Sequence, residues 1–85
     1  MTRIKEFKNK LTQEIIDEKF PWINNADIED AVLGTEYSSL VWYNGIWKNG
    51  TWKNGGWHGG TWKNGTWEDG SWYDGVWKNG FWHVS

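Results

Sequence analysis

The chain has 85 residues, with ten Trp, eleven Gly and no Cys. A chain of this length holds one small domain with little more than one hydrophobic core. The lack of Cys excludes disulfides, thiolate metal ligands and a cysteine nucleophile, so aromatic packing has to provide the stability. The formal net charge of -2 is too small to indicate a nucleic-acid partner.

The N-terminal segment, residues 1–20, predicts an amphipathic helix, with Thr2 as its N-cap and Pro21 as its end. Its apolar residues recur at intervals of three or four, namely Ile4, Phe7, Leu11, Ile15 and Ile16. We expect this helix to cap a β domain formed by residues 21–85. The N-terminus lacks the apolar run of a signal peptide, so we expect a cytoplasmic location in a bacterial host cell, or association with a virion.

From residue 41 onward, the chain repeats a five-residue unit with Trp in one fixed position. The Trp residues are Trp42, Trp47, Trp52, Trp57, Trp62, Trp67, Trp72, Trp77 and Trp82. The glycines between them are Gly45, Gly50, Gly55, Gly60, Gly65, Gly70, Gly75 and Gly80, and all except Gly60 follow Asn or Asp. A period of five fits neither a helix nor a straight strand, so the chain has to turn at these glycines in every unit. We therefore predict that the Trp residues form a structural ladder inside the domain.

The stretch Ala26-Asp27-Ile28-Glu29-Asp30 and the spacing of Ile23, Ile28 and Leu33 resemble the pentapeptide-repeat family. That resemblance implies a right-handed, four-sided β-helix over residues 21–85. In the Trp-rich part the chain departs from the family pattern, because Trp replaces the central Leu or Phe and Gly replaces Ala two residues earlier. Short Trp-Gly repeats of this kind are similar to those of uncharacterised phage and bacterial proteins.

The predicted fold class is mainly β, and two architectures satisfy a turn in every unit. In a pentapeptide-type β-solenoid with four units per coil, Trp42, Trp62 and Trp82 would stack, as would Trp47 on Trp67. Lys48 would then lie over Glu68. In the alternative, each Asn-Gly is a hairpin loop, and very short strands form a meander that closes into a shallow barrel.

No residue set in the sequence indicates catalysis, so we predict that the protein is not an enzyme and needs no cofactor. The carboxylates Asp27, Glu29 and Asp30, like the pair Glu68 and Asp69, occupy turn and outward positions. His58 and His83 could approach one another in a coiled geometry, but no Cys, Asp or Glu arrangement accompanies them. We therefore predict no metal site.

These features predict a structural scaffold or a protein-interaction module, whose partner is another protein or a second copy of the chain. The open C-terminal end, with Phe81, Trp82 and Val84, is expected to form a homodimer. The alternative is a carbohydrate-binding module that uses exposed Trp residues. We expect no membrane partner, and four Lys against three acids in residues 41–85 argue against nucleic acid.

Overall fold

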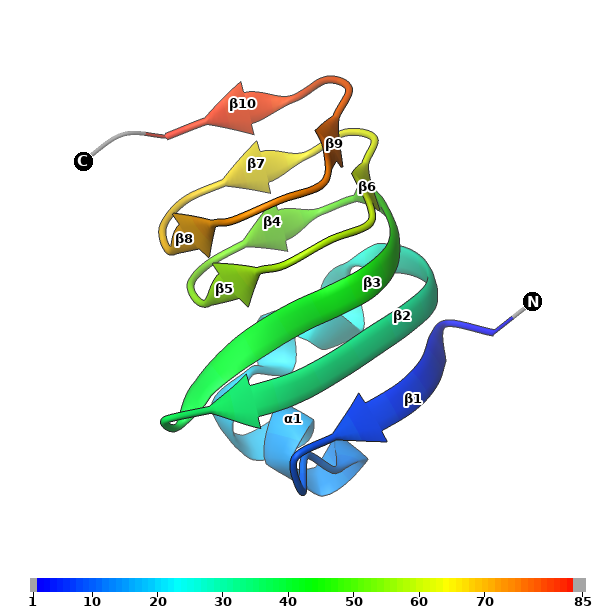
Figure 1. The fold of residues 1–85 in the computed structure, drawn as a ribbon, viewed down its shortest axis with the longest axis vertical. Helices are drawn as coiled ribbons and strands as arrows, with labels where there is room; N and C mark the ends of the chain where they lie inside the picture. The colour runs from blue at the N-terminus through cyan, green and yellow to red at the C-terminus, as the bar shows by residue number, and fades with distance from the viewer. Residues whose placement is uncertain (1, 84–85) are drawn as a thin grey trace.

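A computed structural model describes residues 2–83 and shows a mainly β domain, as predicted (Figure 1). The N-terminal part contains β1 (Ile4–Lys8), α1 (Gln13–Lys19) and the 3-10 helix η1 (Pro21–Asn25). Two long strands follow, β2 (Asp27–Glu36) and β3 (Ser39–Asn49). The remaining strands are very short: β4 (Thr51–Trp52), β5 (Gly56–Trp57), β6 (Thr61–Trp62), β7 (Thr66–Trp67), β8 (Ser71–Trp72), β9 (Val76–Trp77) and β10 (Phe81–Trp82).

The helix predicted over residues 1–20 is wrong in its first half, where β1 pairs in parallel with β2 and places Phe7 beside Leu33. Positive φ angles at Asn9 (56°) and Lys10 (68°) separate this strand from the helix. Thr12, not Thr2, is the N-cap, because its hydroxyl accepts a hydrogen bond from the Ile15 N–H. Pairing with β2 satisfies the backbone of residues 4–8, and this tertiary contact outweighs the helical spacing of their apolar side chains.

Strands β2 and β3 form an antiparallel hairpin through Tyr37 and Ser38, which both have positive φ (52° and 67°). Their register places Ile28 beside Trp47 and Leu33 beside Trp42. The spacing of Ile28 and Leu33 therefore matches the Trp spacing, but the chain runs in the opposite direction. We call η1 and β2 together the base layer. The expectation that residues 21–33 belong to the same winding repeat is wrong, because β2 runs antiparallel to the repeat.

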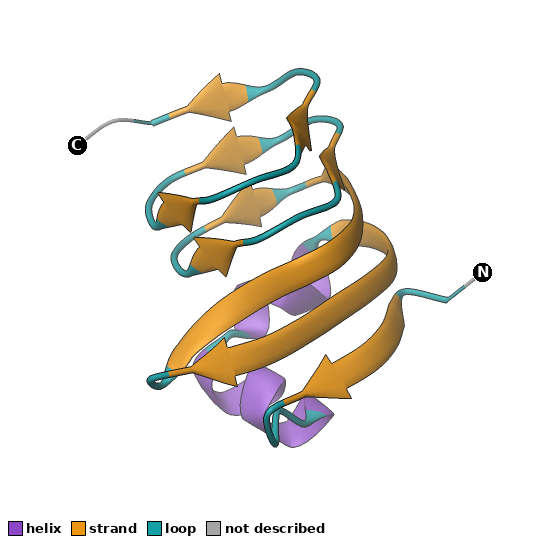
Figure 2. Cartoon of the chain, in the orientation of Figure 1, coloured by secondary structure: helices purple, strands orange, loops and turns teal. Residues whose placement is uncertain are grey.

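Beyond the hairpin, the chain returns to the same place after every third repeat unit, and each short strand pairs in parallel with the strand three units later (Figure 2). Three layers follow one another along the chain. The first contains Trp42, Trp47 and Trp52, the second Trp57, Trp62 and Trp67, and the third Trp72, Trp77 and Trp82. The expected coil of four units is therefore wrong, and so is the hairpin meander, whose strands would be antiparallel.

Indoles three units apart stack face to face, with ring centroids 4.7–5.4 Å apart and interplanar angles of 4–14°. Neighbouring indoles within a layer meet edge to face, for example Trp42 and Trp47 at 5.7 Å. Three large side chains fill the centre of a layer in this way, since each of Trp42, Trp47 and Trp52 contacts the other two. The six Trp residues of the first two layers are buried, each at most 1% exposed.

All eight turn glycines have positive φ, from 91° to 127°. At Gly65 (φ 126°) a Cβ atom would also collide with the Gly50 carbonyl oxygen in the layer below. In six of these turns, the glycine N–H donates a hydrogen bond of 2.8–2.9 Å to the side-chain Oδ1 of the preceding Asn or Asp. The accepting residues are Asn44, Asn49, Asn54, Asp69, Asp74 and Asn79. Asn and Asp are thus favoured as hydrogen-bond acceptors, while the glycine alone adopts the left-handed conformation.

Replacement of Trp62 by Ala should lower the free energy of unfolding by about 3–5 kcal/mol, because the indole is buried between Trp47 and Trp77. Trp82→Ala is the matched control, since Trp82 is 47% exposed and stacks on one side only. Urea unfolding measures both variants. Equal losses would contradict a core role for the ladder.

Gly65→Val should destabilise the protein far more than Thr66→Val, because a β-branched residue at residue 65 would meet both the unfavourable φ and the Gly50 carbonyl. Thr66 lies in a strand, where a β-branched residue is favoured. Thermal unfolding of the two variants compares the effects directly. Similar melting temperatures would show that the turn glycine is not required.

Candidate functional site: the aromatic side of the Trp repeat

The residue that follows each Trp lies on the outside of the stack, and the three-unit winding gathers these residues into columns on three sides. Backbone hydrogen bonds fix the columns, as when His58 N–H donates to the Trp42 carbonyl at 2.7 Å and Tyr73 N–H to the Trp57 carbonyl at 2.8 Å. One column contains Tyr43, His58 and Tyr73, the second Lys48, Lys63 and Lys78, and the third Lys53, Glu68 and His83. We call the side with the first column the aromatic side.

On the aromatic side, the three rings lie next to one another. The His58 ring centroid is 5.4 Å from that of Tyr43 and 4.8 Å from that of Tyr73, with tilted planes. Tyr73 is 67% exposed, so one aromatic surface remains open to solvent. An exposed aromatic ring held by its neighbours presents a planar apolar surface at low entropic cost.

The residues that precede Trp on this side are Val41, Gly56 and Ser71, whereas the corresponding residues on the other sides are Ile46, Thr61 and Val76, or Thr51, Thr66 and Phe81. Gly56 and Ser71 are smaller than their counterparts, and a groove lies beside them. The groove has a volume of about 320 Å³. Glu36, Ser39, Asn54, His58 and Tyr73 line it together with these small residues.

A second depression of about 200 Å³ lies next to this groove, and both are lined by Ser39, Asn54 and Gly55. Its far part is formed by Lys19, Phe20 and Trp22 from the end of α1 and from η1. Trp22 is partly buried against Trp52 with an edge-to-face contact of 5.1 Å, so its position is fixed by the ladder. We call these two neighbouring depressions together the extended groove, which is lined by Trp22 of the base layer and by His58 and Tyr73 of the aromatic side.

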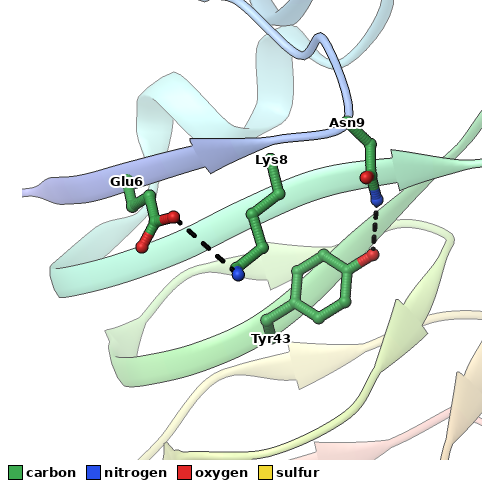
Figure 3. Close-up of polar contacts among 4 residues, drawn as sticks. All are labelled: Glu6, Lys8, Asn9 and Tyr43. Carbon is green, nitrogen blue, oxygen red and sulfur yellow. Dashed lines mark hydrogen bonds and ion pairs between the residues drawn. The ribbon is translucent and has the colours of Figure 1, made fainter.

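Tyr43 is the anchored member of the aromatic column (Figure 3). Its hydroxyl accepts a hydrogen bond from the Asn9 amide at 2.9 Å and donates one to a Glu36 carboxylate oxygen at 2.6 Å. Lys8, paired with Glu6 at 3.8 Å, places its ammonium group 5.9 Å from the centre of the Tyr43 ring. Burial, followed by the hydrogen bond to Glu36, raises the pKa of Tyr43 to about 12.

In the lysine column, the charge of Lys48 is neutralised by an acidic partner. Lys48 lies 2.8 Å from a Glu29 carboxylate oxygen of β2, and this hydrogen-bonded partner raises the pKa of Lys48. The expected pairing of Lys48 with Glu68 is wrong, because Glu68 belongs to the third column. Exposed ion pairs of this kind contribute little to stability, because water and salt screen them.

The two histidines do not come together, because His58 lies on the aromatic side and His83 in the column of Lys53 and Glu68. Among residues 2–83, no group of three metal-ligating side chains is present. The acidic residues are similarly dispersed, since Glu29 pairs with Lys48 and Asp69 accepts a hydrogen bond from Gly70.

Of the residues predicted for self-association, Phe81 and Trp82 form β10, at the end of the stack farthest from β1 (Figure 1). Phe81 is 77% exposed and Trp82 47%, while Val84 lies outside the described residues. The sequence interpretation missed Tyr43, Tyr73 and Trp22 as surface-forming aromatic residues. A signal for the first two was present, because in two of the three columns the residue after Trp keeps its type in every third unit: Tyr43, His58, Tyr73 and Lys48, Lys63, Lys78.

Comparison with protein-family models, curated protein sequences and solved structures finds no match to this chain. The pentapeptide-repeat resemblance therefore rests on the residues quoted above. Within the described part of the chain, no helix has the length and the apolar character needed to cross a membrane.

Spectrophotometric titration should show one of the three tyrosines ionising near pH 12, and this step should be absent in Tyr43→Phe. Because the folded pKa lies above the unfolded value near 10, the contribution of Tyr43 to stability is complete below pH 10. It is lost as the pH rises toward 12, so the stability of the wild type relative to that of Tyr43→Phe should fall over this range. The absence of an ionisation step near pH 12 in the wild type would contradict the assignment.

Proposed function

We propose that the protein is a non-enzymatic scaffold or protein-interaction module, built as a three-sided β-solenoid that associates with a second copy through its third layer. The observation that carries this proposal is the incomplete cover of that layer. Trp82 is 47% exposed, Val76 52% and Phe81 77%, whereas every Trp of the first two layers is buried. Exposed strand edges with large apolar side chains favour pairing with another chain.

The choice of a second copy is supported by the way in which the chain covers its own first layer. There, β2 runs antiparallel to β3 and places Ile28 and Leu33 beside Trp47 and Trp42. An antiparallel layer therefore fits against the end of the Trp ladder. A second molecule related by a two-fold axis perpendicular to the stack would present such an antiparallel layer to β8, β9 and β10.

The register of the base layer also indicates where the axis would lie. The base layer is centred on the side of Trp47, and the corresponding strand of the third layer is β9 with Trp77. A two-fold axis at Trp77 pairs Trp77 with the partner's Trp77 and Trp72 with the partner's Trp82. All three partly exposed indoles of each chain would then be covered at once.

The protein should be a dimer at micromolar concentration, and Phe81→Lys should make it monomeric, because the axis at Trp77 buries Phe81 near the partner's Tyr73. Tyr37→Lys is the control, since Tyr37 is fully exposed at the β2–β3 turn, away from the third layer. Light scattering measures the mass of each variant. A monomeric wild type, or a dimer that survives Phe81→Lys, would rule out association through this end.

The same axis brings the Lys78 side chains of the two chains close together, because each follows Trp77. Lys78→Ala should therefore tighten the dimer, while Lys63→Ala in the same column should leave the dissociation constant unchanged. A weaker dimer in Lys78→Ala would place the axis elsewhere.

Glycan binding through exposed Trp residues, the alternative function, has little support in this arrangement. Six of the nine indoles in the ladder are at most 1% exposed, and their faces stack on other indoles.

A further inference from the structure

The extended groove on the aromatic side lies outside the ladder, and Ser71 and Tyr73 among its lining residues border the third-layer strands of the proposed self-association. We propose that this groove binds a short, neutral oligosaccharide, with a sugar ring against the tyrosine and histidine column and a second ring toward Trp22. The proposal does not depend on the scaffold function.

The groove exists because of two residues that the fold does not require to be small. Gly56 and Ser71 lie where the other sides have Thr61, Thr66 or larger residues. Gly56 is not among the residues with positive φ, and a Cβ atom there would make ordinary contacts, 3.4 Å from Tyr73 and 3.7 Å from His58. The backbone would thus accept a larger side chain, which would fill the groove next to the aromatic rings.

The lining combines the two properties that a sugar ring needs. The C–H bonds on one face of a pyranose pack against the electron-rich face of an aromatic ring, and Tyr73 supplies an exposed ring of this kind. The hydroxyl groups at the edge of the sugar need hydrogen-bond acceptors and donors. Glu36, Asn54, His58 and Ser71 provide a carboxylate, an amide, an imidazole and a hydroxyl along the same groove.

The length and the charge of the groove define the ligand further. The two depressions have volumes of about 320 Å³ and 200 Å³ and share the lining residues Ser39, Asn54 and Gly55, so a ligand that occupies both is longer than one ring. Their charged lining residues, Glu36 and Lys19, have opposite signs. The lysine column lies on another side of the stack, so an anionic polymer is not favoured here.

The proposal is tested by titrating the protein with cellohexaose, xylohexaose, maltohexaose and chitohexaose, followed by amide chemical shifts and calorimetry. At least one of these glycans should bind with a dissociation constant of about 1 mM or lower and shift the amides of Asn54, Gly56 and Ser71. His58→Ala and Tyr73→Ala should each weaken binding by roughly tenfold. Lys63→Ala is the matched control, because Lys63 occupies the position of His58 on another side, and it should leave the affinity unchanged.

Gly56→Thr gives a second test that removes no ligand contact and fills the groove instead. It should abolish binding while the urea midpoint stays within error of the wild type, since Thr occupies the same position before Trp52, Trp62 and Trp67. The proposal is overturned if none of the four glycans binds, or if their binding is unaffected by both His58→Ala and Gly56→Thr. It is also overturned if the groove binds choline or trimethyllysine but no glycan, since the aromatic rings would then serve as a cation site. A monomeric wild type that still binds a glycan would separate this proposal from the dimer.

Discussion

Face-to-face stacking of indoles from every third unit is the interaction on which the rest of this structure depends. It fixes the distance between layers, the direction of every short strand and the position of every turn glycine. It also has a cost, because the buried N–H groups of Trp42, Trp47, Trp52, Trp57 and Trp62 make no hydrogen bond within the described part of the chain. Aromatic contact area and dispersion must therefore exceed the hydration that these five groups lose.

Because the interior is nearly uniform, differences between the sides arise only from residues that the ladder does not constrain. The residue after each Trp and the residue before it are free to vary, and they produce an aromatic side, a lysine side and a mixed side. The two ends of the stack differ for another reason. An antiparallel base layer and α1 close one end, whereas the third layer has no comparable cover among residues 2–83.

The sequence was sufficient to predict burial of the Trp repeat and turns at glycine, because only these choices satisfy a period of five. The number of sides could not follow from that period, since three and four sides keep every Trp inside equally well. Only the pairing of strands three units apart, which is a contact between distant residues, shows that there are three sides. Strand β1 was mispredicted because its apolar spacing fits a helix, and pairing between Phe7 and Leu33 cannot be seen locally. The groove was missed because Gly56 is informative only when compared with Thr61 and Thr66 on the other sides.

Because the winding has three sides, the surface pattern repeats every three units, whereas the core pattern repeats in every unit. Deleting one repeat unit, for example residues 61–65, would keep all remaining Trp residues inside and every remaining turn glycine in place. It would nevertheless move Tyr73 out of the column of Tyr43 and His58 and put Lys78 in its place. Only insertions or deletions of three whole units preserve both the buried Trp residues and the surface columns. The repeat can therefore gain or lose a single unit without loss of folding. Its surface columns are kept only when a whole layer of three units is added or removed.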